Sequence, residues 1–538
     1  MEELTTDILV IGSGLAGILS ALEAERTGLQ VLLTGKFTIA LGTNTSMANG
    51  AFTAANSRFS EEDHLRLTLE AGKGLNRIER VETLVRNARD AIERLREYDV
   101  PILEGTIGYW IDRPSTCSQL PGVLLVKALA ERLKSSTIRL LPGFVVFELV
   151  VEKGQVRGAM GFLKEGKPLL IRSRAVVLAT GGAGAIYARN DNQRSILGDG
   201  YALGLRAGLS LFDLEFVQFF PLVLAEPNLS TFMLFPPYPE EAKLVDPKGK
   251  DLLERLAIGT NLSQAVITQR DRFSIALYEN SEKEDIYLDL TKVPEEKWEH
   301  YPLNLLRKSK FPFRERPFLV LPAVHFFMGG VETDDEGRTS LEGLFAAGEV
   351  TWGAHGANRL GGNALTECAV MGMRTGRAAA HYARLKDLGK VTVSKWEKRV
   401  RDHLKRKAGG LDSSRDLLRK LKSLAWRTVG PIRDERTMKE GLSELASLEE
   451  RIAILHPTSI PELLRKRELE NVALLLRALL MGSLSRTESR GSFYRRDFPH
   501  EDDPHCLKTT CYRLKEGELL VTHRPVNERA EGLEFGPL

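Results

Sequence analysis

The chain has 538 residues, 43% of them hydrophobic, and its 75 basic and 72 acidic residues leave a formal net charge of +3. A chain of this length can bury a large core and is expected to form roughly two to four domains. The near balance of charge argues against nucleic acid or an anionic membrane surface as a partner. Four cysteines indicate a reducing compartment without a disulfide framework, and their spacing suits no iron–sulfur cluster.

The sequence shows no localisation signal. No apolar run is long enough to cross a bilayer, and the N-terminus leads directly into a strand-like segment instead of a signal peptide. We therefore expect a cytoplasmic protein without a membrane span of its own, which partner subunits could still bring to a membrane. No grouping of side chains predicts a metal site.

The N-terminal segment carries a dinucleotide-binding fingerprint. A strand-like run at 7–11 is followed by Gly12-Ser13-Gly14-Leu15-Ala16-Gly17 and then by a helical pattern. Glycines in this strand–turn–helix context let the main chain approach a pyrophosphate at the start of a helix. The second strand, at 30–33, lacks the acidic residue that usually holds a ribose hydroxyl. We expect ribose contacts from the main chain, Lys36 or Glu349.

A second glycine turn follows a buried strand at 175–179. It reads Ala179-Thr180-Gly181-Gly182, and Gly198-Asp199-Gly200 then precedes another helical pattern. A single NAD-binding unit needs no second turn of this kind, whereas an extended FAD is gripped by several loops. The two turns together therefore predict FAD.

The segments between and after these turns are less specific. Residues 36–55 form a small, polar loop, and 60–100 and 123–134 have helical patterns. Strands are predicted near 145–151, 156–163 and 168–171, in an antiparallel sheet. His64 is expected to be solvated or to cap a helix.

The segment from His325 to Gly372 concentrates ionisable residues around glycines. A buried strand at 344–348 ends at Glu349, a glycine-rich loop with His355 and Arg359 follows, and a helical pattern begins at Asn363 as a plausible N-cap. Such a loop between strand and helix lets main-chain amides approach an anionic ligand.

These stretches together resemble the flavoprotein family of fumarate reductase, succinate dehydrogenase and L-aspartate oxidase, in the same order along nearly the whole chain. The matching motifs are Gly12–Gly17, Ala179–Gly182, Gly198–Gly200, Phe216–Phe219, His325, Met328–Gly330, Ala347–Glu349, His355–Asn363 and Ser485–Gly491. The resemblance implies an α/β fold with a Rossmann-like FAD-binding domain at 1–222 and 321–385. It further implies an inserted α+β capping domain at 223–320, a helical domain at 386–490 and a C-terminal extension at 491–538. The sequence pattern of that extension predicts hairpin strands at 509–514 and 518–523.

The resemblance also implies the residues of the site. His325 and Arg359 would hold a substrate carboxylate, and His355 is a further catalytic candidate, which could instead bond to the main chain. Asn44 aligns with the histidine that carries the flavin covalently in respiratory members, and because an amide cannot form that bond, FAD should be bound non-covalently. The expected FAD contacts are Gly12, Ser13, Gly14, Ala16, Gly17, Lys36, Asn44, Ser46, Asn49, Gly50, Ala179, Thr180, Gly181, Gly182, Asp199, Glu349, Arg359, Asn363, Ala364 and Leu365.

The chain departs from the family in the capping segment. Ile275 aligns with the arginine that relays a proton to fumarate, and Phe220 aligns with a histidine. Arg272 could share a helical face with Ile275 and replace that arginine, or it could be a surface residue in a salt bridge. Fumarate and succinate are therefore expected to be poor substrates. The side chains expected to give the pocket an aromatic character are Phe219, Phe220, Phe326, Phe327 and Trp352.

Three functions remain open at this point. The first is an FAD-dependent oxidoreductase that transfers hydride or electrons between a carboxylate-bearing organic substrate and a second acceptor or donor. The second is a flavin-bearing electron-transfer subunit in a complex with an iron–sulfur protein. The third is a degenerate member of the family in which FAD is chiefly structural.

Overall fold

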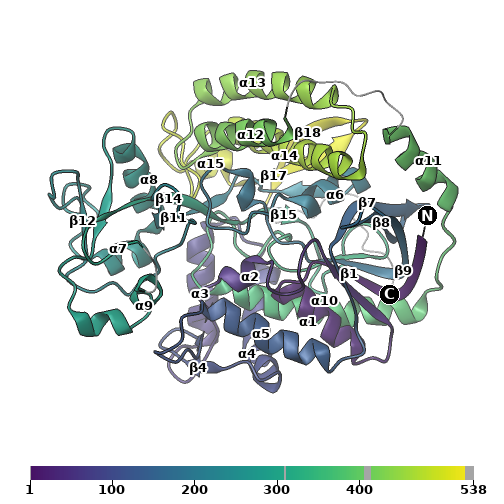
Figure 1. The fold of residues 1–538 in the computed structure, drawn as a ribbon, viewed down its shortest axis with the longest axis horizontal. Coiled ribbons are helices and arrows are strands. Elements are labelled where there is room, and N and C mark those ends of the chain that lie inside the picture. The colour runs from purple at the N-terminus through teal and green to yellow at the C-terminus, as the bar shows by residue number, and fades with distance from the viewer. Residues whose placement is uncertain (1, 308–310, 405–412, 527–538) are drawn as a thin grey trace.

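The computed structural model describes residues 2–307, 311–404 and 413–526. In Figure 1 its elements form a large sheet with flanking helices, a cap at the left and a helical bundle along the top. The chain leaves the large sheet for the cap through β11 (Val217–Leu224) and returns through β14 (Phe318–Phe327). This confirms the predicted α/β architecture with an inserted cap, followed by a helical domain. The predicted domain boundaries stay predictions.

The large sheet has seven strands in the order β6-β2-β1-β9-β8-β7, with β16 beside β9. Neighbours among β6, β2, β1, β9 and β16 run parallel, whereas β8 and β7 continue from β9 as antiparallel strands. The strands are β1 (Glu2–Ile11), β2 (Val31–Gly35), β6 (Arg139–Pro142), β7 (Phe144–Glu152), β8 (Gln155–Leu163), β9 (Pro168–Leu178) and β16 (Leu344–Ala346). The parallel strands bring their carboxyl ends to one edge, where sheets of this kind bind ligands.

The sequence predicted two strands where the structure has one. The stretches 168–171 and 175–179 are joined in β9, which ends at Leu178. Up to Arg172 this strand pairs with β8, and from Val176 it pairs with β16, while β1 lies along its other side. The change of partner needs no break in the backbone, so the polar residues between the two apolar runs gave a false boundary.

Helices cover the sheet at close range. On α1, the main chain of Ala16 and Ser20 faces two glycines of α10. A Cβ added at Gly372 would lie 2.7 Å from the Ala16 carbonyl oxygen, and one at Gly376 would lie 2.3 Å from that of Ser20. Small residues therefore set the distance between these helices. The elements on this side are α1 (Leu15–Glu25), α2 (Asn44–Met47), β3 (Ala51–Phe52), α3 (Glu61–Gly72), α4 (Ile78–Glu97), β4 (Ile102–Glu104), β5 (Tyr109–Ile111), α5 (Pro121–Lys134) and α10 (Asn363–Leu385).

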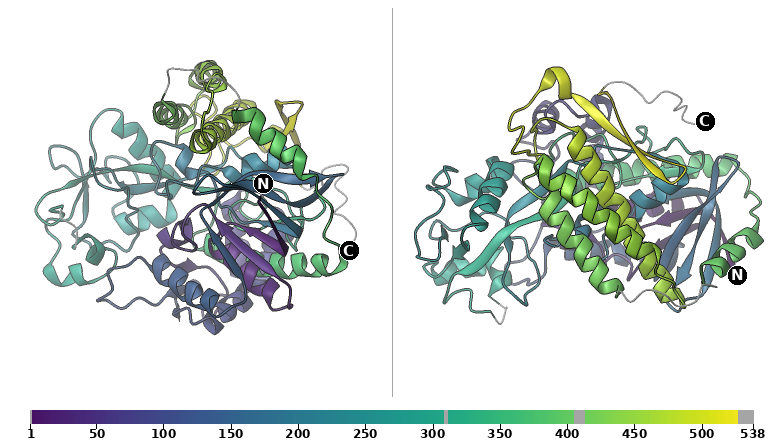
Figure 2. Two further views of the ribbon diagram at one scale, coloured as in Figure 1. Left: turned by 45° about the vertical axis from the view of Figure 1, so that its right-hand side comes forward. Right: turned by 90° about the horizontal axis from the view of Figure 1, so that it is seen from above.

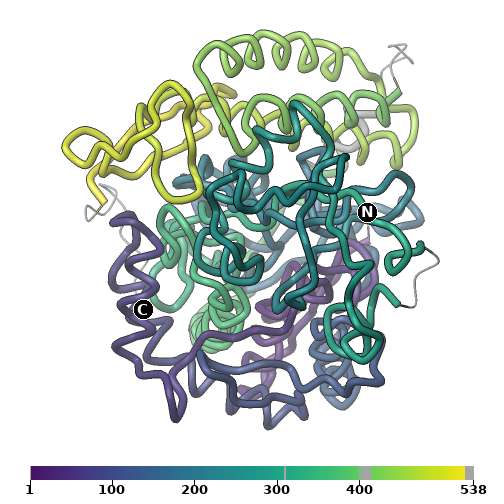
Figure 3. Tube along the Cα trace, turned by 90° about the vertical axis from the view of Figure 1, so that its left-hand side faces the viewer, coloured from purple at the N-terminus to yellow at the C-terminus, as the bar shows by residue number. Residues whose placement is uncertain are grey.

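The cap has its own sheet and core. Its four strands follow the order β11-β14-β13-β12, and buried apolar residues from Phe220 to Ala323 form a separate cluster. Figure 3 views the molecule from the side where the cap faces the reader. The remaining cap elements are β12 (Lys243–Val245), α7 (Leu262–Thr268), α8 (Arg270–Ser281), β13 (Tyr287–Asp289), η2 (Glu295–Glu299) and α9 (Leu303–Leu306).

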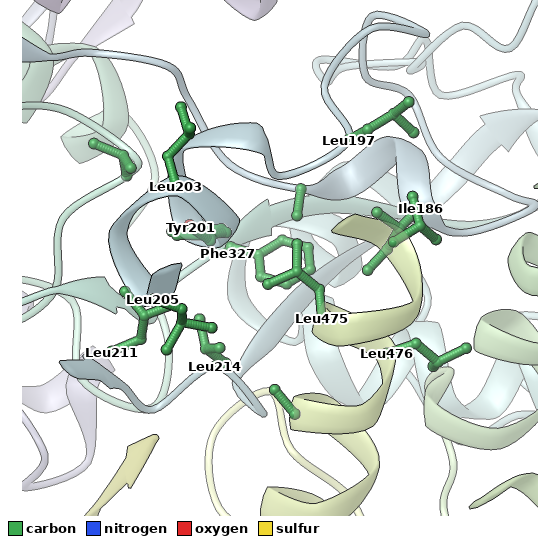
Figure 4. Packing of buried hydrophobic residues seen from close by; sticks show 14 of the residues in the cluster. Ile186, Leu197, Tyr201, Leu203, Leu205, Leu211, Leu214, Phe327, Leu475 and Leu476 are labelled. Atoms are coloured by element: carbon green, nitrogen blue, oxygen red, sulfur yellow. The ribbon is translucent and has the colours of Figure 1, made fainter. Parts of the chain in front are cut away.

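The C-terminal part combines helices with a hairpin, as predicted. Helices α12 (Ser414–Val429), α13 (Glu435–Ala453) and α14 (Ile460–Ser485) pack together (Figure 2), and α11 (Val393–Leu404) contacts α14 through a separate apolar cluster that contains Trp396 and Leu463. Figure 4 shows Leu475 of α14 in the same apolar cluster as Tyr201 and Phe327. The hairpin strands are β17 (Lys508–Lys515) and β18 (Glu518–Pro525). Residues 527–538 of the predicted extension lie outside the described residues.

Short elements connect these groups. Strand β17 also pairs with β10, so the hairpin joins the FAD side of the molecule. A buried ion pair supports this junction, because Arg486 donates to Glu215 (3.0 Å), which also accepts the Tyr512 hydroxyl (2.6 Å). The connecting elements are η1 (Gly184–Ile186), α6 (Asp199–Ala207), β10 (Ser210–Phe212), β15 (Gly330–Val331) and α15 (Asp503–Cys506).

Candidate active site

A deep cavity, here called the main cavity, opens at the carboxyl ends of the parallel strands. Its walls come from segments far apart in the sequence, including both glycine turns and part of the cap. Most of the predicted contact residues line it. Outside the cap, the lining segments include 11–16, 34–38, 42–45, 47–51, 144–146, 179–181, 195–199, 347–349 and 361–362.

The two glycine turns pack directly against each other. Gly12 has φ +114°, and a Cβ there would lie 2.0 Å from the carbonyl oxygen of Ala179. A Cβ at Gly17 would lie 1.9 Å from the carbonyl oxygen of Gly12, so Gly17 serves packing and does not line the cavity. Gly182 likewise lies outside the lining, with the Glu349 carboxylate where its Cβ would be. Only glycine allows this convergence.

Lys36 and Asp199 meet at one end of the cavity. The Lys36 ammonium lies 3.1 Å from Asp199 and 2.6 Å from Glu468, which comes from α14. Burial alone would lower the pKa of Lys36, but the two carboxylates together raise it above its usual range. The sequence predicted the first two residues and missed Glu468, because no local pattern connects α14 to the second strand.

Glu349 ends the central strand as a buried carboxyl group. Burial raises its pKa to about 7, although the main-chain N–H of Phe327 donates to it at 3.2 Å. Nearby, the buried hydroxyl of Thr180 has no hydrogen-bond partner among the residues that the structure describes. An acceptor and an unsatisfied hydroxyl beside two glycine turns fit a hydroxyl-rich nucleotide such as FAD.

The polar loop after β2 contributes only part of its predicted contacts. Asn44 lines the cavity, and its amide donates to Asn192 (2.6 Å) while accepting from the main-chain N–H of Gln193 (3.0 Å). Asn49 and Gly50 also line it. Ser46 does not, because its hydroxyl bonds to the carbonyl oxygens of Leu41 and Thr43.

His325 reaches the cavity in partnership with a residue that the sequence did not single out. Its Nδ1 lies 2.8 Å from a carboxylate oxygen of Asp191, and both residues line the cavity. The ring of Phe220 lies 5.9 Å from the imidazole. Asp191 sits in a polar stretch between the second glycine turn and Asp199, where no motif marked it.

Arg359 is held by its neighbours but not by a carboxylate. It donates to the side-chain oxygen of Gln218 (2.7 Å) and lies 4.6 Å from the centre of the Phe326 ring. Burial, together with the nearby charge of Arg270, lowers its pKa to about 9. Among the described residues no carboxylate forms an ion pair with Arg359, and its buried Nε has no partner. The ligand contact predicted for Arg359 stays a prediction.

The structure corrects the expectation for the arginine of the capping segment. Arg272 is exposed and does not line the cavity, whereas Arg270 does. Arg272 and Ile275 do share the more exposed face of α8, so Arg272 cannot act in the cavity. Arg270 is half-buried, donates to the carbonyl oxygen of Arg359 (2.8 Å) and has an enclosed Nε without a partner in the described structure. Burial lowers its pKa.

Three further expectations around the glycine-rich loop were wrong. His355 is buried outside the cavity lining, 3.0 Å from Glu367, so it bonds to a side chain and not to substrate. Helix α10 begins at Asn363, but Asn363 is not its N-cap; Gly362 is. The Asn363 side chain bonds to His64 (2.8 Å) and Thr68 (3.0 Å) away from the cavity. His64 is therefore fully buried instead of solvated.

The aromatic wall differs in part from the one predicted. Phe220 and Phe326 line the cavity, but Phe219 and Phe327 pack in the core, and Trp352 donates to Asp213 (2.7 Å). The cap supplies three apolar residues that the sequence did not mark, Phe232, Met233 and Phe235. These residues lie in a segment without regular pattern, so only the fold brings them to the cavity.

The described residues contain no cluster of three or more side chains suited to a metal ion. Within the same ranges, no helix combines the length and apolarity needed to cross a membrane.

Comparison with known proteins agrees with this geometry. Residues 7–365 match the family model of the FAD binding domain, and residues 418–534 match that of the fumarate reductase flavoprotein C-terminus. One component of the CoM/CoB fumarate reductase of Methanothermobacter marburgensis is 32% identical over 528 residues, covering 92% of this chain and 94% of that protein. L-aspartate oxidase 1 of Ralstonia nicotianae is 31% identical, covering 92% and 95%.

A solved structure shows the same similarity in three dimensions. A quinol-fumarate reductase with menaquinol molecules superposes with a TM-score of 0.89 at 25% identity, covering 99% of this chain and 100% of that one. Both glycine turns that line the main cavity fall within the matched FAD binding domain. The chain therefore belongs to the flavoprotein family of fumarate reductase, succinate dehydrogenase and L-aspartate oxidase, and it is an FAD-dependent oxidoreductase.

Proposed function

We propose that the protein transfers hydride between FAD in the main cavity and a small organic acid whose carboxylate is bound by Arg359 and Arg270. One observation carries this proposal. Two guanidinium groups line the same cavity without an ion pair to a described carboxylate, and each has an enclosed Nε that lacks a partner. Buried charge without a partner is costly, and a bidentate carboxylate would satisfy it.

The chain's own residues divide the remaining tasks. Arg359 is fixed by Gln218 and by the Phe326 ring, so it presents its fork in a defined orientation. His325, oriented by Asp191, can hold or release a proton at its outer nitrogen. Phe220, Phe232 and Phe235 exclude water from the part of the main cavity that is next to the two arginines and His325. Bound FAD supplies the acceptor or donor of the hydride.

The arginine side and the apolar wall of the main cavity together indicate the class of substrate. Arg270 is bonded to the main chain of Arg359, so both arginines serve one carboxylate. The wall of Phe220, Met233 and Phe235 favours an apolar remainder over a second carboxylate, and we propose that fumarate and succinate are poor substrates. However, alkene reduction is chemically open, because Arg270 lines the cavity and its guanidinium carries N–H groups that could deliver a proton.

Anaerobic flavin spectra test the proposal. Saturated and amino acids such as succinate, L-aspartate and their alkyl-substituted analogues are added to oxidised enzyme, and fumarate and alkyl-substituted enoic acids are added to dithionite-reduced enzyme. We expect at least one alkyl-substituted acid to bleach or restore the flavin absorbance faster than the unsubstituted dicarboxylates do. If no acid changes the redox state of the flavin in either direction, the proposal is wrong.

A second function, electron transfer to or from an iron–sulfur partner, has its own support. Phe37 lines the main cavity and is 54% exposed, and neighbouring Leu41 is 47% exposed. The cavity thus reaches the surface beside an apolar rim, where a partner's redox centre could approach. The Methanothermobacter relative is itself named as one part of a larger enzyme. Co-purification of an iron–sulfur protein with the chain from its native cells would support this function; isolation of the chain alone with full turnover would oppose it.

A further inference from the structure

A second cavity, here called the outer cavity, lies between the cap and the β4–β5 hairpin and shares two wall residues with the main cavity, Asn49 and Phe235. We propose that it binds the apolar tail of the substrate acid, so that the enzyme acts on elongated monocarboxylates. This inference rests on the proposed function. Its lining includes Leu103 and Trp110 from the hairpin and Pro236, Pro237 and Tyr301 from the cap.

The partition between the two cavities is thin and made of side chains. The Tyr301 hydroxyl donates to the side-chain oxygen of Asn49, whose amide lies 3.9 Å from the Met233 sulfur. Phe235 stands beside this pair, with its ring 5.9 Å from that of Trp110. In this proposal, rotation of these side chains joins the two spaces when a tail is bound.

The outer cavity is built for apolar contact. Leu103 is 54% exposed and Trp110 is 39% exposed, although large apolar side chains in contact with water favour burial. Both come from the β4–β5 hairpin, and Pro236, Pro237 and the Tyr301 ring continue the surface from the cap. An alkyl chain or aromatic ring placed here would cover these residues.

The charges of the outer cavity exclude a second carboxylate. Asp112 and Glu299 line it and would repel an anion. Two described basic residues line it, Arg113 and His300; Arg113 donates to the Gln119 carbonyl oxygen (2.7 Å) and to Asn304 (3.0 Å) and lies over the Tyr301 ring. The substrate class is thus an acid with a single carboxylate at Arg359 and an apolar tail that extends past Phe235.

Ligand binding to the FAD-loaded protein tests this inference without turnover. Butanoate, hexanoate, octanoate and decanoate are titrated, and Kd is read from the change in the flavin absorbance spectrum. We expect Kd to fall about three- to fourfold for each methylene that enters the outer cavity. A Kd that does not change with chain length would overturn the inference and leave the proposed function intact. If no acid perturbs the flavin, both are refuted.

Variants of the β4–β5 hairpin test where the apolar tail of the acid binds. Trp110→Ala and Leu103→Ser should each raise the Kd of decanoate about tenfold and leave that of butanoate unchanged. Ile107→Ser is the matched control, because Ile107 is 52% exposed on the same hairpin but does not line the outer cavity. The control should bind every acid as the wild type does. Equal weakening of butanoate and decanoate in the Trp110 and Leu103 variants would contradict the assignment.

Discussion

Arg270 of the cap donates a hydrogen bond to the main-chain carbonyl oxygen of Arg359, at 2.8 Å. The bond crosses from the inserted cap to the glycine-rich loop of the FAD domain and brings two cations to one side of the cavity. Like charges repel, and this arrangement is supported by the neutral acceptors Gln218 and Asn358 and by the nearby buried carboxyl group of Asp271, which in the described structure forms no ion pair with either arginine. An anionic ligand would relieve the repulsion, which is the basis of our proposal that the pair binds the substrate carboxylate.

Replacement of Arg359 separates substrate binding from cofactor binding. Arg359→Ala should slow reduction or reoxidation of the flavin by the substrate acid by about 100-fold or more, because a bidentate ion pair is lost. FAD content should fall far less, since the glycine turns hold the nucleotide. The measurement is stopped-flow flavin absorbance, together with the flavin-to-protein ratio. Equal loss of both would mean that Arg359 is a structural arginine.

Asp191 positions His325, and its replacement should affect the chemical step. Asp191→Asn should lower kcat about tenfold with little change in KM, because the imidazole loses its charged partner but the arginines still bind substrate. Asp191→Glu should recover part of the lost activity if orientation is the reason. A purely structural role would instead reduce FAD content and thermal stability in both variants with kcat per flavin unchanged.

When the protein is denatured, it should release FAD as an intact molecule. Asn44 provides an amide where respiratory relatives carry the covalent histidine, and that amide is bonded to Asn192 and Gln193. After precipitation with acid, the yellow colour should therefore appear in the supernatant, where chromatography identifies it as FAD. Flavin that remains with the precipitated chain would contradict non-covalent binding.

The FAD-free protein should lose stability as pH rises from 4.5 to about 7. The reason is that burial raises the pKa of the Glu349 carboxyl group from its usual value of 4.5 to about 7 in the folded state. A raised carboxyl pKa means that the folded state binds the proton more tightly than the unfolded chain. Protonated Glu349 therefore contributes its full stabilisation to the free energy of unfolding at low pH, and this stabilisation is lost above pH 7. The effect is on the order of 3 kcal/mol. Glu349→Gln should flatten the pH dependence of the urea unfolding free energy.

The buried pair of Asp213 and Glu215 also contributes to the pH dependence of the unfolding free energy. Burial and the charge of Glu215 raise the pKa of Asp213 to about 7 as well, which adds to the wild-type slope. The Glu349→Gln variant should therefore retain part of the slope. An unchanged slope in the variant would show that Glu349 does not titrate in this window.

Much of the fold could be predicted from local patterns. The turn at Gly12–Gly17, the turn at Ala179–Gly182 and the hairpin after Thr509 each appear in the structure because glycine placement and strand alternation act over a few residues. Joined strand β9 shows the limit of this approach, since polar residues such as Arg172 and Arg174 interrupt the apolar pattern without interrupting the strand.

The site was less predictable because its parts depend on helix phase and tertiary contact. Helix α7 ends at Thr268 and α8 begins at Arg270, so the intervening Gln269, with φ −129°, resets the helical phase. The spacing of Arg272 and Ile275 placed both residues on one face of α8, as the structure shows, but it could not show that this face is turned away from the cavity. Contacts such as Asp191 with His325 or Glu468 with Lys36 join residues that have no relation in sequence.

The most direct measurement compares Arg270→Gln with Arg272→Gln. The two arginines lie on the same helix, but Arg270 lines the cavity while Arg272 is exposed, so the variants differ chiefly in that placement. Both proteins are loaded with FAD, reduced with dithionite and mixed anaerobically with an enoic acid that reoxidises the wild-type flavin. The account predicts at least about 100-fold slower reoxidation for Arg270→Gln and a wild-type rate for Arg272→Gln. A wild-type rate for Arg270→Gln, or equal loss in both, would contradict it.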